Sequence, residues 1–284
     1  MKLLWNNYYI LLHTVKITQL ITYYKNLKMK IAIVGKGGVG KTTISGTLSR
    51  IFAQQGKKVL AIDADPNPNL STVLGLKRDA PQPKPLSTDI LERVDDGEGK
   101  TKIIVKFPLQ EVLDEYAQQA PDNVTLLMVG KPEVANSGCM CGSHACVRAL
   151  IHSALEESSD HITIVDMEAS LEHMKRGTSQ HVDVMLGIVE PYYRSLEAVA
   201  RFADLAKGLD IKKFWIVANK VKNEEDEKAI RQFCTKMNLD LHLIIPFEDK
   251  VTEADLHGNS FIDYSKKNSV VSALTHLADE LSLN

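Results

Sequence analysis

A glycine-rich loop directly after an apolar run constrains the fold of this chain more than any other feature. Residues 35–43 read Gly-Lys-Gly-Gly-Val-Gly-Lys-Thr-Thr, between the apolar residues 31–34 and a stretch of helical period. Glycines let the backbone turn tightly and aim its N–H groups at phosphate oxygens, and the following helix adds the positive end of its dipole. Strand, loop and helix in this order predict a phosphate-binding loop (P-loop) and hence nucleotide binding.

Two side chains of this loop have predicted roles in phosphate chemistry. Lys41 can reach the β- and γ-phosphates, and the Thr42 hydroxyl can ligate Mg²⁺. The expected nucleotide contacts within the loop are Gly35, Lys36, Gly37, Gly38, Val39, Gly40, Lys41, Thr42 and Thr43.

Lys36 is a second lysine in the same loop, and taken alone it is interpreted as an exposed loop charge. The run Lys-Gly-Gly-Val-Gly-Lys-Thr, however, resembles the deviant Walker A motif of the MinD, ParA and nitrogenase-iron-protein class of ATPases. In that class the early lysine reaches across a dimer interface to the partner's nucleotide. The resemblance implies ATP as the nucleotide, a nucleotide-dependent homodimer, and hydrolysis controlled by dimerisation.

Two further apolar runs end in the carboxylates expected beside a P-loop. Residues 59–63 end in Asp63 and continue to Asp65, a pattern similar to the switch I aspartate motif of the same class. This similarity implies that Asp65 positions or activates the attacking water and that Asp63 lies near Mg²⁺. The alternative is that Asp63 only caps the strand and Asp65 the following turn. Residues 162–166 end in Asp166, the Walker B arrangement that holds a Mg²⁺-bound water.

Apolar strand-like runs alternate with helix-like stretches along the chain. This alternation predicts an α/β fold with a doubly wound, mainly parallel sheet and the nucleotide at the carboxyl ends of the strands. Strands are expected at residues 30–34, 59–63, 124–129, 162–166, 184–189, 214–218 and 241–245. The first helix is expected to run from the P-loop to Gly56, and others are expected at residues 147–157, 195–207, 224–237 and 270–281.

We interpret residues 29–284 as one ATPase domain with an irregular surface insertion near residues 77–99, which is rich in proline, glycine and charge. Residues 1–28 differ from the rest because they contain no Asp, Glu, Gly, Pro, Ala or Arg. We interpret them as a non-native or disordered extension before a true start at Met29. The alternative is a real amphipathic leader or membrane-surface helix.

Charge and hydropathy exclude several functional classes. Without the four lysines of residues 1–28, the chain has 30 basic and 36 acidic residues, so no nucleic-acid footprint is visible. The longest apolar run of residues 1–28 is far too short to span a membrane, and they lack a secretory cleavage pattern. We therefore expect a cytoplasmic protein with neither nucleic acid nor membrane as a partner.

A narrower resemblance appears in residues 166–178, Asp-Met-Glu-Ala-Ser-Leu-Glu-His-Met-Lys-Arg-Gly-Thr, and continues through residues 189–221. These segments are similar to the CooC-type ATPases that mature carbon monoxide dehydrogenase. That family also carries a Cys-x-Cys pair about 25 residues before Walker B, here Cys139 and Cys141. The resemblance implies a homodimeric ATPase that binds nickel or zinc with cysteines from both protomers and serves insertion of nickel into a client metalloenzyme.

The cysteine chemistry leaves the exact ligand set open. Two thiolates two residues apart can chelate one ion but fill only half of a tetrahedral or square-planar site, which a second protomer would complete. Cys146 and His144 depart from the family pattern, and each is either a further ligand or part of helix packing. Ser170 stands where the family usually has glycine. Cys234, alone on an apolar helix face, is expected in the core.

Two more positions are assigned by resemblance to the adenine side of the site. Asn219 follows an apolar run and, as in the ATPase class, is expected to recognise adenine through its amide; otherwise it is a turn residue. Pro246 begins the second adenine-side loop. Two alternative functions remain: an iron–sulfur reductase or carrier subunit like the nitrogenase iron protein, and a positioning ATPase like ParA or MinD.

Overall fold

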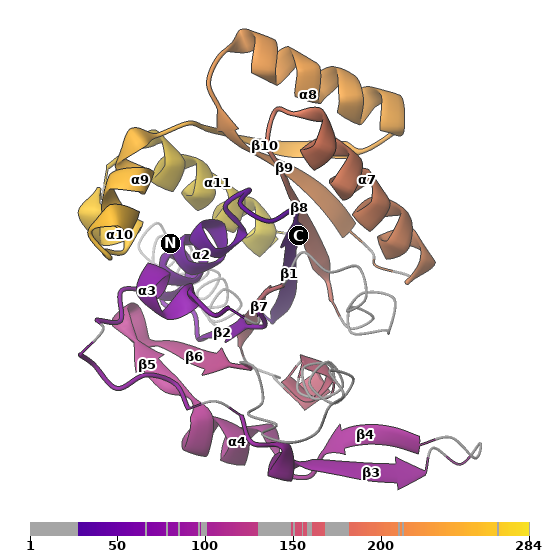
Figure 1. The fold of residues 1–284 in the computed structure, drawn as a ribbon, viewed down its shortest axis with the longest axis vertical. Helices are drawn as coiled ribbons and strands as arrows, with labels where there is room; N and C mark the ends of the chain where they lie inside the picture. The colour runs from indigo at the N-terminus through magenta and orange to yellow at the C-terminus, as the bar shows by residue number, and fades with distance from the viewer. Residues whose placement is uncertain are drawn as a thin grey trace, which may run out of the picture.

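The structure is a computed structural model, and it describes residues 28–65, 67–77, 79–84, 86–95, 97, 101–129, 149, 151–154, 156–157, 161–167, 182–209, 211, 213–265 and 267–283. Within this part, eight strands form one sheet (Figure 1). All neighbouring strands are parallel except the antiparallel pair β5–β6 at one edge. The strand order is β10 (Asp240–Pro246), β9 (Lys213–Val221), β8 (Val184–Val189), β1 (Met29–Gly35), β7 (Ile162–Asp166), β2 (Val59–Asp63), β6 (Val124–Met128), β5 (Gln118–Ala120).

The central strand β1 is buried on both faces, as its uninterrupted apolar sequence predicts. Ile31 and Ile33 join one hydrophobic core, and Ala32 and Val34 join the other. One face carries α2 (Lys41–Gln54), α3 (Leu70–Leu74), α9 (Asp249–Leu256), α10 (Phe261–Tyr264) and α11 (Ser269–Leu283); the other carries α4 (Leu109–Tyr116), α7 (Tyr193–Gly208) and α8 (Glu224–Met237) (Figure 1).

A buried arginine holds the helical layer around α2 together. Arg50 is 3% exposed, and its guanidinium donates to both Asp263 oxygens at 2.8 and 2.9 Å and to the Leu74 carbonyl at 3.0 Å. It also pairs with Asp122 in η2 (Pro121–Asn123). Burial opposes the charge, but the two carboxylates outweigh it and raise the pKa of Arg50. The segment that carries the P-loop is thereby anchored to α3, η2 and α10.

The predicted α/β fold is confirmed, and all seven predicted strands are present. The irregular conformation expected at residues 77–99 is wrong over η1 (Thr88–Ile90) and β3 (Leu91–Asp95). Strand β3 pairs with β4 (Thr101–Val105) as an antiparallel hairpin outside the main sheet (Figure 1). Glu92 and Arg93 are consecutive exposed polar residues, so β3 lacks the alternation of apolar and polar residues that marks a half-buried strand.

Several short elements were not predicted, and other predictions cannot be compared. The sequence interpretation missed α3, α4, β5, α9 and α10, which are too short for a clear period. The described part of the expected helix 147–157 is helical. Residues 1–27 of the expected extension lie outside the described residues, and the assignment of residues 29–284 to one domain stays a prediction.

Candidate nucleotide-binding site

The P-loop lies at the carboxyl end of β1, between β7 and β8, where chain connections leave the sheet in opposite directions. This is the switch point at which doubly wound sheets bind ligands. Gly40 precedes α2 with a left-handed backbone (φ 94°), and a Cβ there would lie 2.4 Å from the Asn219 Nδ2 atom. Only glycine satisfies both the backbone angle and the close approach.

The N-terminus of α2 can bind an anion. Helix α2 has no side-chain cap and no acidic residue in its first turn, so its first N–H groups and dipole face the loop without a competing carboxylate. Lys41 is only 7% exposed, and its Nζ atom lies 3.4 Å from the Lys36 carbonyl oxygen, folded back over the loop. An ammonium there can move from a long backbone contact onto a phosphate oxygen.

Asp166 supplies a buried carboxylate beside the helix start. It is 1% exposed, and its Oδ1 atom accepts a hydrogen bond of 3.2 Å from the Ser45 hydroxyl. Its Oδ2 atom is buried and has no hydrogen-bond partner within the described part of the chain. Burial raises the pKa of Asp166 to about 7 and Asp63 adds to this, whereas Thr42, Lys41 and Ser45 lower it.

The unsatisfied Asp166 oxygen and the Thr42 hydroxyl fit a Mg²⁺ ion. Oxygen donors are the ligands that Mg²⁺ prefers, and the ion usually keeps several waters while protein contributes one or two groups. A divalent ion would also remove the energetic cost of an ionised Asp166 in this buried position. The chemistry of the donors therefore agrees with the predicted magnesium site.

Asp63 lies beside Asp166 in the sheet, with the two residues in register on β2 and β7. Its Oδ1 atom accepts from the Asp65 N–H at 3.2 Å, and its Oδ2 atom accepts from the N–H groups of Asn69 and Leu70 at 3.0 and 2.9 Å. Burial raises the pKa of Asp63 to about 6, and these hydrogen bonds oppose that rise. Asp63 thus shapes the loop after β2, which matches the capping alternative.

Asp65 itself caps the next turn of that loop, because its Oδ1 atom accepts from the Asn67 N–H at 2.8 Å. The roles predicted for Asp65 at the attacking water and for Asp63 at Mg²⁺ stay predictions. Both aspartates nevertheless lie at the same edge of the sheet as the P-loop and Asp166, as expected.

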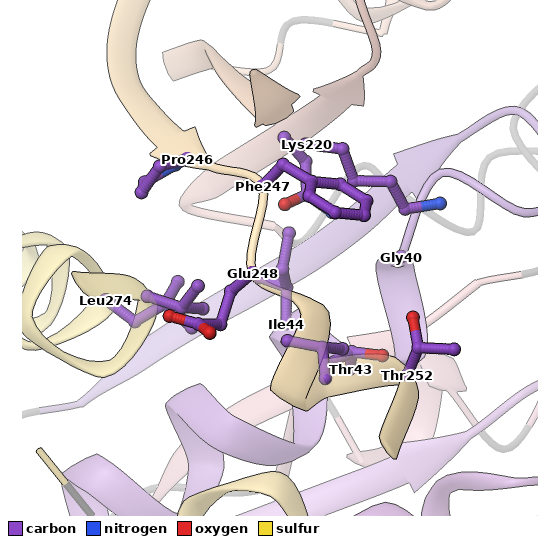
Figure 2. Close-up of a pocket in the computed structure, with 12 residues that line it drawn as sticks. Gly40, Thr43, Ile44, Lys220, Pro246, Phe247, Glu248, Thr252 and Leu274 are labelled. Atoms are coloured by element: carbon purple, nitrogen blue, oxygen red, sulfur yellow. The ribbon is translucent and has the colours of Figure 1, made fainter. Parts of the chain in front are cut away.

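A second part of the site is a mainly apolar pocket beside Gly40 (Figure 2). It is partly open to solvent, with a cavity volume of about 60 Å³, and it brings together the predicted residues Asn219 and Pro246 with the start of α2. Segments far apart in sequence contribute the rest of the wall: Thr43, Ile44, Lys220, Phe247, Glu248, Val251, Thr252, Val270 and Leu274. An apolar pocket with a few polar groups beside a phosphate-binding loop has the character expected for a nucleotide base.

Two consecutive residues at the end of β9 hold the P-loop from this side. Asn219 Nδ2 donates to the Val39 carbonyl at 2.8 Å, and Lys220 Nζ donates to the Gly38 carbonyl at 2.7 Å. Lys220 also forms an ion pair with Glu190, the first residue after β8. The sequence interpretation missed Lys220 and Glu190, although each lies at the carboxyl end of a strand beside the P-loop, which was the available signal.

Lys36 is half-buried, and its Nζ atom lies 5.4 Å from the centroid of the Tyr192 ring. A cation over an aromatic face is attracted by the ring, so Tyr192 holds this ammonium at the rim of the loop. Tyr192 and Tyr193 are 37% and 70% exposed. The predicted reach of Lys36 to a partner's nucleotide stays a prediction.

The predicted cysteine site cannot be compared, because Cys139, Cys141 and Cys146 lie outside the described residues, as do His144 and Ser170. Elsewhere, the described ranges contain no cluster of three or more His, Cys, Asp or Glu residues suited to a metal. Cys234 is buried in the core as expected, and burial raises its pKa to about 11. No helix in the described part is both long and apolar enough to cross a membrane.

The fold and the site define a P-loop nucleotide-binding protein. Residues 30–261 match the model of the CobQ/CobB/MinD/ParA nucleotide binding domain, and the chain belongs to this family. It is accordingly an ATP hydrolase of the MinD/ParA class, for which ATP and Mg²⁺ are the expected cofactors.

Two curated relatives are similar over most of their length. The chain is 36% identical to the carbon monoxide dehydrogenase accessory protein CooC of Rhodospirillum rubrum, over 84% of this chain and 90% of that protein. It is also 36% identical to an uncharacterized ATP-binding protein of Methanocaldococcus jannaschii, over 81% and 90%. The solved structure of MinD with Mg-ADP from Pyrococcus horikoshii has a TM-score of 0.65 at 22% identity, covers 90% of this chain and 96% of its own, and shows the shared fold.

Proposed function

We propose that this ATPase binds a nickel or zinc ion through Cys139 and Cys141 and serves nickel insertion into a metalloenzyme such as carbon monoxide dehydrogenase. The observation that carries the proposal is the similarity to the carbon monoxide dehydrogenase accessory protein, which extends over nearly the whole of that relative. The cysteine pair and the residues after Asp166 belong to the same resemblance, and the pair supplies the candidate metal ligands.

ATP binding would use the two parts of the site together. The P-loop N–H groups and Lys41 bind the phosphates, and the pocket around Asn219 and Pro246 takes the adenine. Thr42 and Asp166 would hold Mg²⁺, directly and through a water, and the ion would neutralise charge that develops on the phosphates. Asp65 positions the attacking water, and catalysis consists mainly of positioning and charge stabilisation.

Dimerisation would connect hydrolysis to the metal. Lys36 leaves Tyr192 and reaches the nucleotide of the partner, so the hydrolytic site is complete only in an ATP-bound homodimer. Cys139 and Cys141 from each protomer then form a four-thiolate site across the two-fold axis, with one ion per dimer. Loss of the γ-phosphate loosens the dimer and with it the metal site.

The decisive experiment is equilibrium dialysis of the full chain, purified anaerobically, against Ni²⁺ or Zn²⁺ with and without ATP. The proposal predicts one tightly bound ion per dimer. Cys139→Ser and Cys141→Ser should each abolish tight binding but leave ATP binding intact. Cys234→Ala is the matched control, because that thiol is buried in the hydrophobic core on the inner side of α8. No bound ion under either condition would overturn the metal-handling proposal.

Cys146→Ser decides between two ligand sets. A loss of metal affinity as large as in the other two variants would indicate a single-chain site with one ion per monomer. Unchanged affinity would support the site shared between protomers. Since thiolates must lose protons to bind, affinity should fall as the pH drops below neutral in either arrangement.

A second candidate is an iron–sulfur reductase or carrier subunit. The light-independent protochlorophyllide reductase iron-sulfur ATP-binding protein of Halorhodospira halophila is 26% identical over 83% of this chain and 74% of that protein. Visible charge-transfer absorption and bound iron in the anaerobic protein would support this candidate. Nickel or zinc binding without iron would support the first.

A further inference from the structure

The outer side of the P-loop is held by an ion pair that none of the predicted roles uses. Lys220 Nζ donates to the Gly38 carbonyl at 2.7 Å and is also paired with the Glu190 carboxylate. The Glu190 side chain is 14% exposed, and its backbone N–H donates to the buried Ser195 hydroxyl at 3.0 Å. The pair therefore joins the ends of β8 and β9 to the loop after β1.

The direction of these contacts determines where the loop's N–H groups point. A peptide unit is planar, and its C=O and N–H point in opposite directions. With the Gly38 carbonyl turned out toward Lys220, the Val39 N–H is turned into the loop, where it lies 3.4 Å from the Lys36 carbonyl oxygen. Asn219 acts in the same way on the next peptide, since it holds the Val39 carbonyl at 2.8 Å.

The backbone conformation of Lys220 is a second indication that this residue has a functional role. Its φ angle is 58°, in the left-handed region that residues other than glycine, asparagine and aspartate seldom adopt. Residues with such strained backbones cluster at active sites and ligand clamps. An exposed ion pair by itself contributes little to stability. Here, however, Glu190 is mostly buried, and the Lys220 ammonium also donates to a loop carbonyl.

We propose that Lys220 and Glu190 form a positioning pair for the phosphate-binding loop. Glu190 holds the Lys220 ammonium, which keeps the Gly38 carbonyl turned outward and the Val39 N–H turned toward a bound nucleotide. The inference rests on the proposed binding of ATP by the P-loop. Lys220 also lines the pocket proposed for the base, but the role inferred here is to position the loop backbone, so its loss should weaken the binding of ATP and of GTP to the same extent.

The test compares the full chain with Lys220→Met, which removes the ammonium and keeps most of the aliphatic stem. Kd for Mg-ATP and for Mg-ADP should both rise about tenfold, because nucleotide binding must then also order the loop. The single variant leaves the Glu190 carboxylate unpaired, so the nucleotide-free protein should melt a few degrees lower. The double variant Glu190→Gln/Lys220→Met leaves no unpaired charge and should melt within about 2 °C of wild type. Lys220→Arg should restore most of the affinity. Lys213→Met at the other end of β9 is the matched control and should bind ATP normally.

A double-mutant cycle tests the pairing itself. Glu190→Gln should weaken ATP binding less than Lys220→Met, and the double variant should be no weaker than Lys220→Met alone. Simple addition of the two effects on ATP affinity, normal ATP binding by Lys220→Met, or a double variant that melts well below wild type without nucleotide would overturn the inference. A wild-type chain that fails to bind ATP, or an unaffected Lys41→Ala variant, would instead overturn the proposed P-loop site.

Discussion

The phosphate end and the base end of the candidate site are built in opposite ways. The phosphate end comes from consecutive residues 35–43 and one buried carboxylate, and it works through backbone N–H groups and charge. The base end is an apolar pocket assembled from β9, the loop after β10, α9 and α11 (Figure 2). Functional residues that are neighbours in the chain can be predicted from the sequence, whereas a pocket made of distant segments becomes visible only when the fold brings them together.

The largest effect is expected at the phosphate end, from Lys41→Ala. The substitution removes a buried ammonium folded over the loop, and losing one positioned charge donor typically costs about 10²–10³ in rate. ATP affinity should fall steeply as well, as measured by titration calorimetry.

Lys36→Ala should keep ATP binding and lose ATP-dependent dimerisation and hydrolysis. Normal turnover by Lys36→Ala would show that Lys36 is only a loop charge.

Gly40→Ala should damage both ends at once, because Gly40 is where they meet. A side chain there is strained by the left-handed backbone and collides with Asn219, at a cost of roughly 1–3 kcal/mol. The nucleotide-free protein should melt several degrees lower and bind ATP more weakly. Gly208→Ala in α7 is the control, since a Cβ there meets no atom within 4 Å. Equal melting temperatures for the two variants would contradict the close packing.

Asp166→Asn should separate the stability of the phosphate end from its activity. The pKa of Asp166 is raised, so the folded protein holds its proton more tightly than the unfolded chain, and the ionised form costs stability. Without Mg²⁺ or nucleotide, wild type should therefore gain stability as the pH falls from above 7 toward 4. The variant should be more stable than wild type at pH 8, by roughly 2–4 kcal/mol at about 1.4 kcal/mol per pKa unit, and similar at pH 4.

Urea titrations at both pH values measure this difference in the free energy of unfolding. The variant should keep a smaller dependence of stability on pH, because the pKa of Asp63 is also raised, to about 6. Mg²⁺-dependent hydrolysis should fall in Asp166→Asn. A variant that is less stable than wild type at pH 8 would contradict the buried, unsatisfied carboxylate.

The smallest effect is expected at the base end, from Asn219→Ala. Removing the amide loses its bond to the Val39 carbonyl and the predicted contact with adenine. Affinity for ATP should fall about tenfold, and the preference for ATP over GTP should shrink. Unchanged discrimination between ATP and GTP would leave Asn219 as a positioning residue of the loop only.

Much of the fold followed from the sequence because buried parallel strands are long apolar runs. The phosphate end was predicted for a similar reason, since the glycines, Lys41 and Thr42 are neighbours in the chain. At the base end, Asn219 and Pro246 were reached only by resemblance, and the pocket wall from Thr252 and Leu274 was missed. No local pattern marks these two residues, because their position in the pocket wall depends on how α9 and α11 pack.

Lys220 and the hairpin show a second limit. A lysine after a strand is an ordinary surface residue in the sequence, and only the geometry links it to Gly38 and Glu190. The β3–β4 hairpin lies outside the sheet, so burial does not impose on it the alternation from which strands are predicted.

The most direct test is a crystal structure of the full chain with Mg²⁺ and a non-hydrolysable ATP analogue. The account predicts the phosphates on the N–H groups of the P-loop, the ion beside Thr42 and Asp166, and the adenine between Asn219 and the loop that begins at Pro246. The Lys220 ammonium should still contact the Gly38 carbonyl. A base bound outside that pocket, or an ion remote from Asp166, would contradict the claim that the phosphate end and the base end form one ATP site.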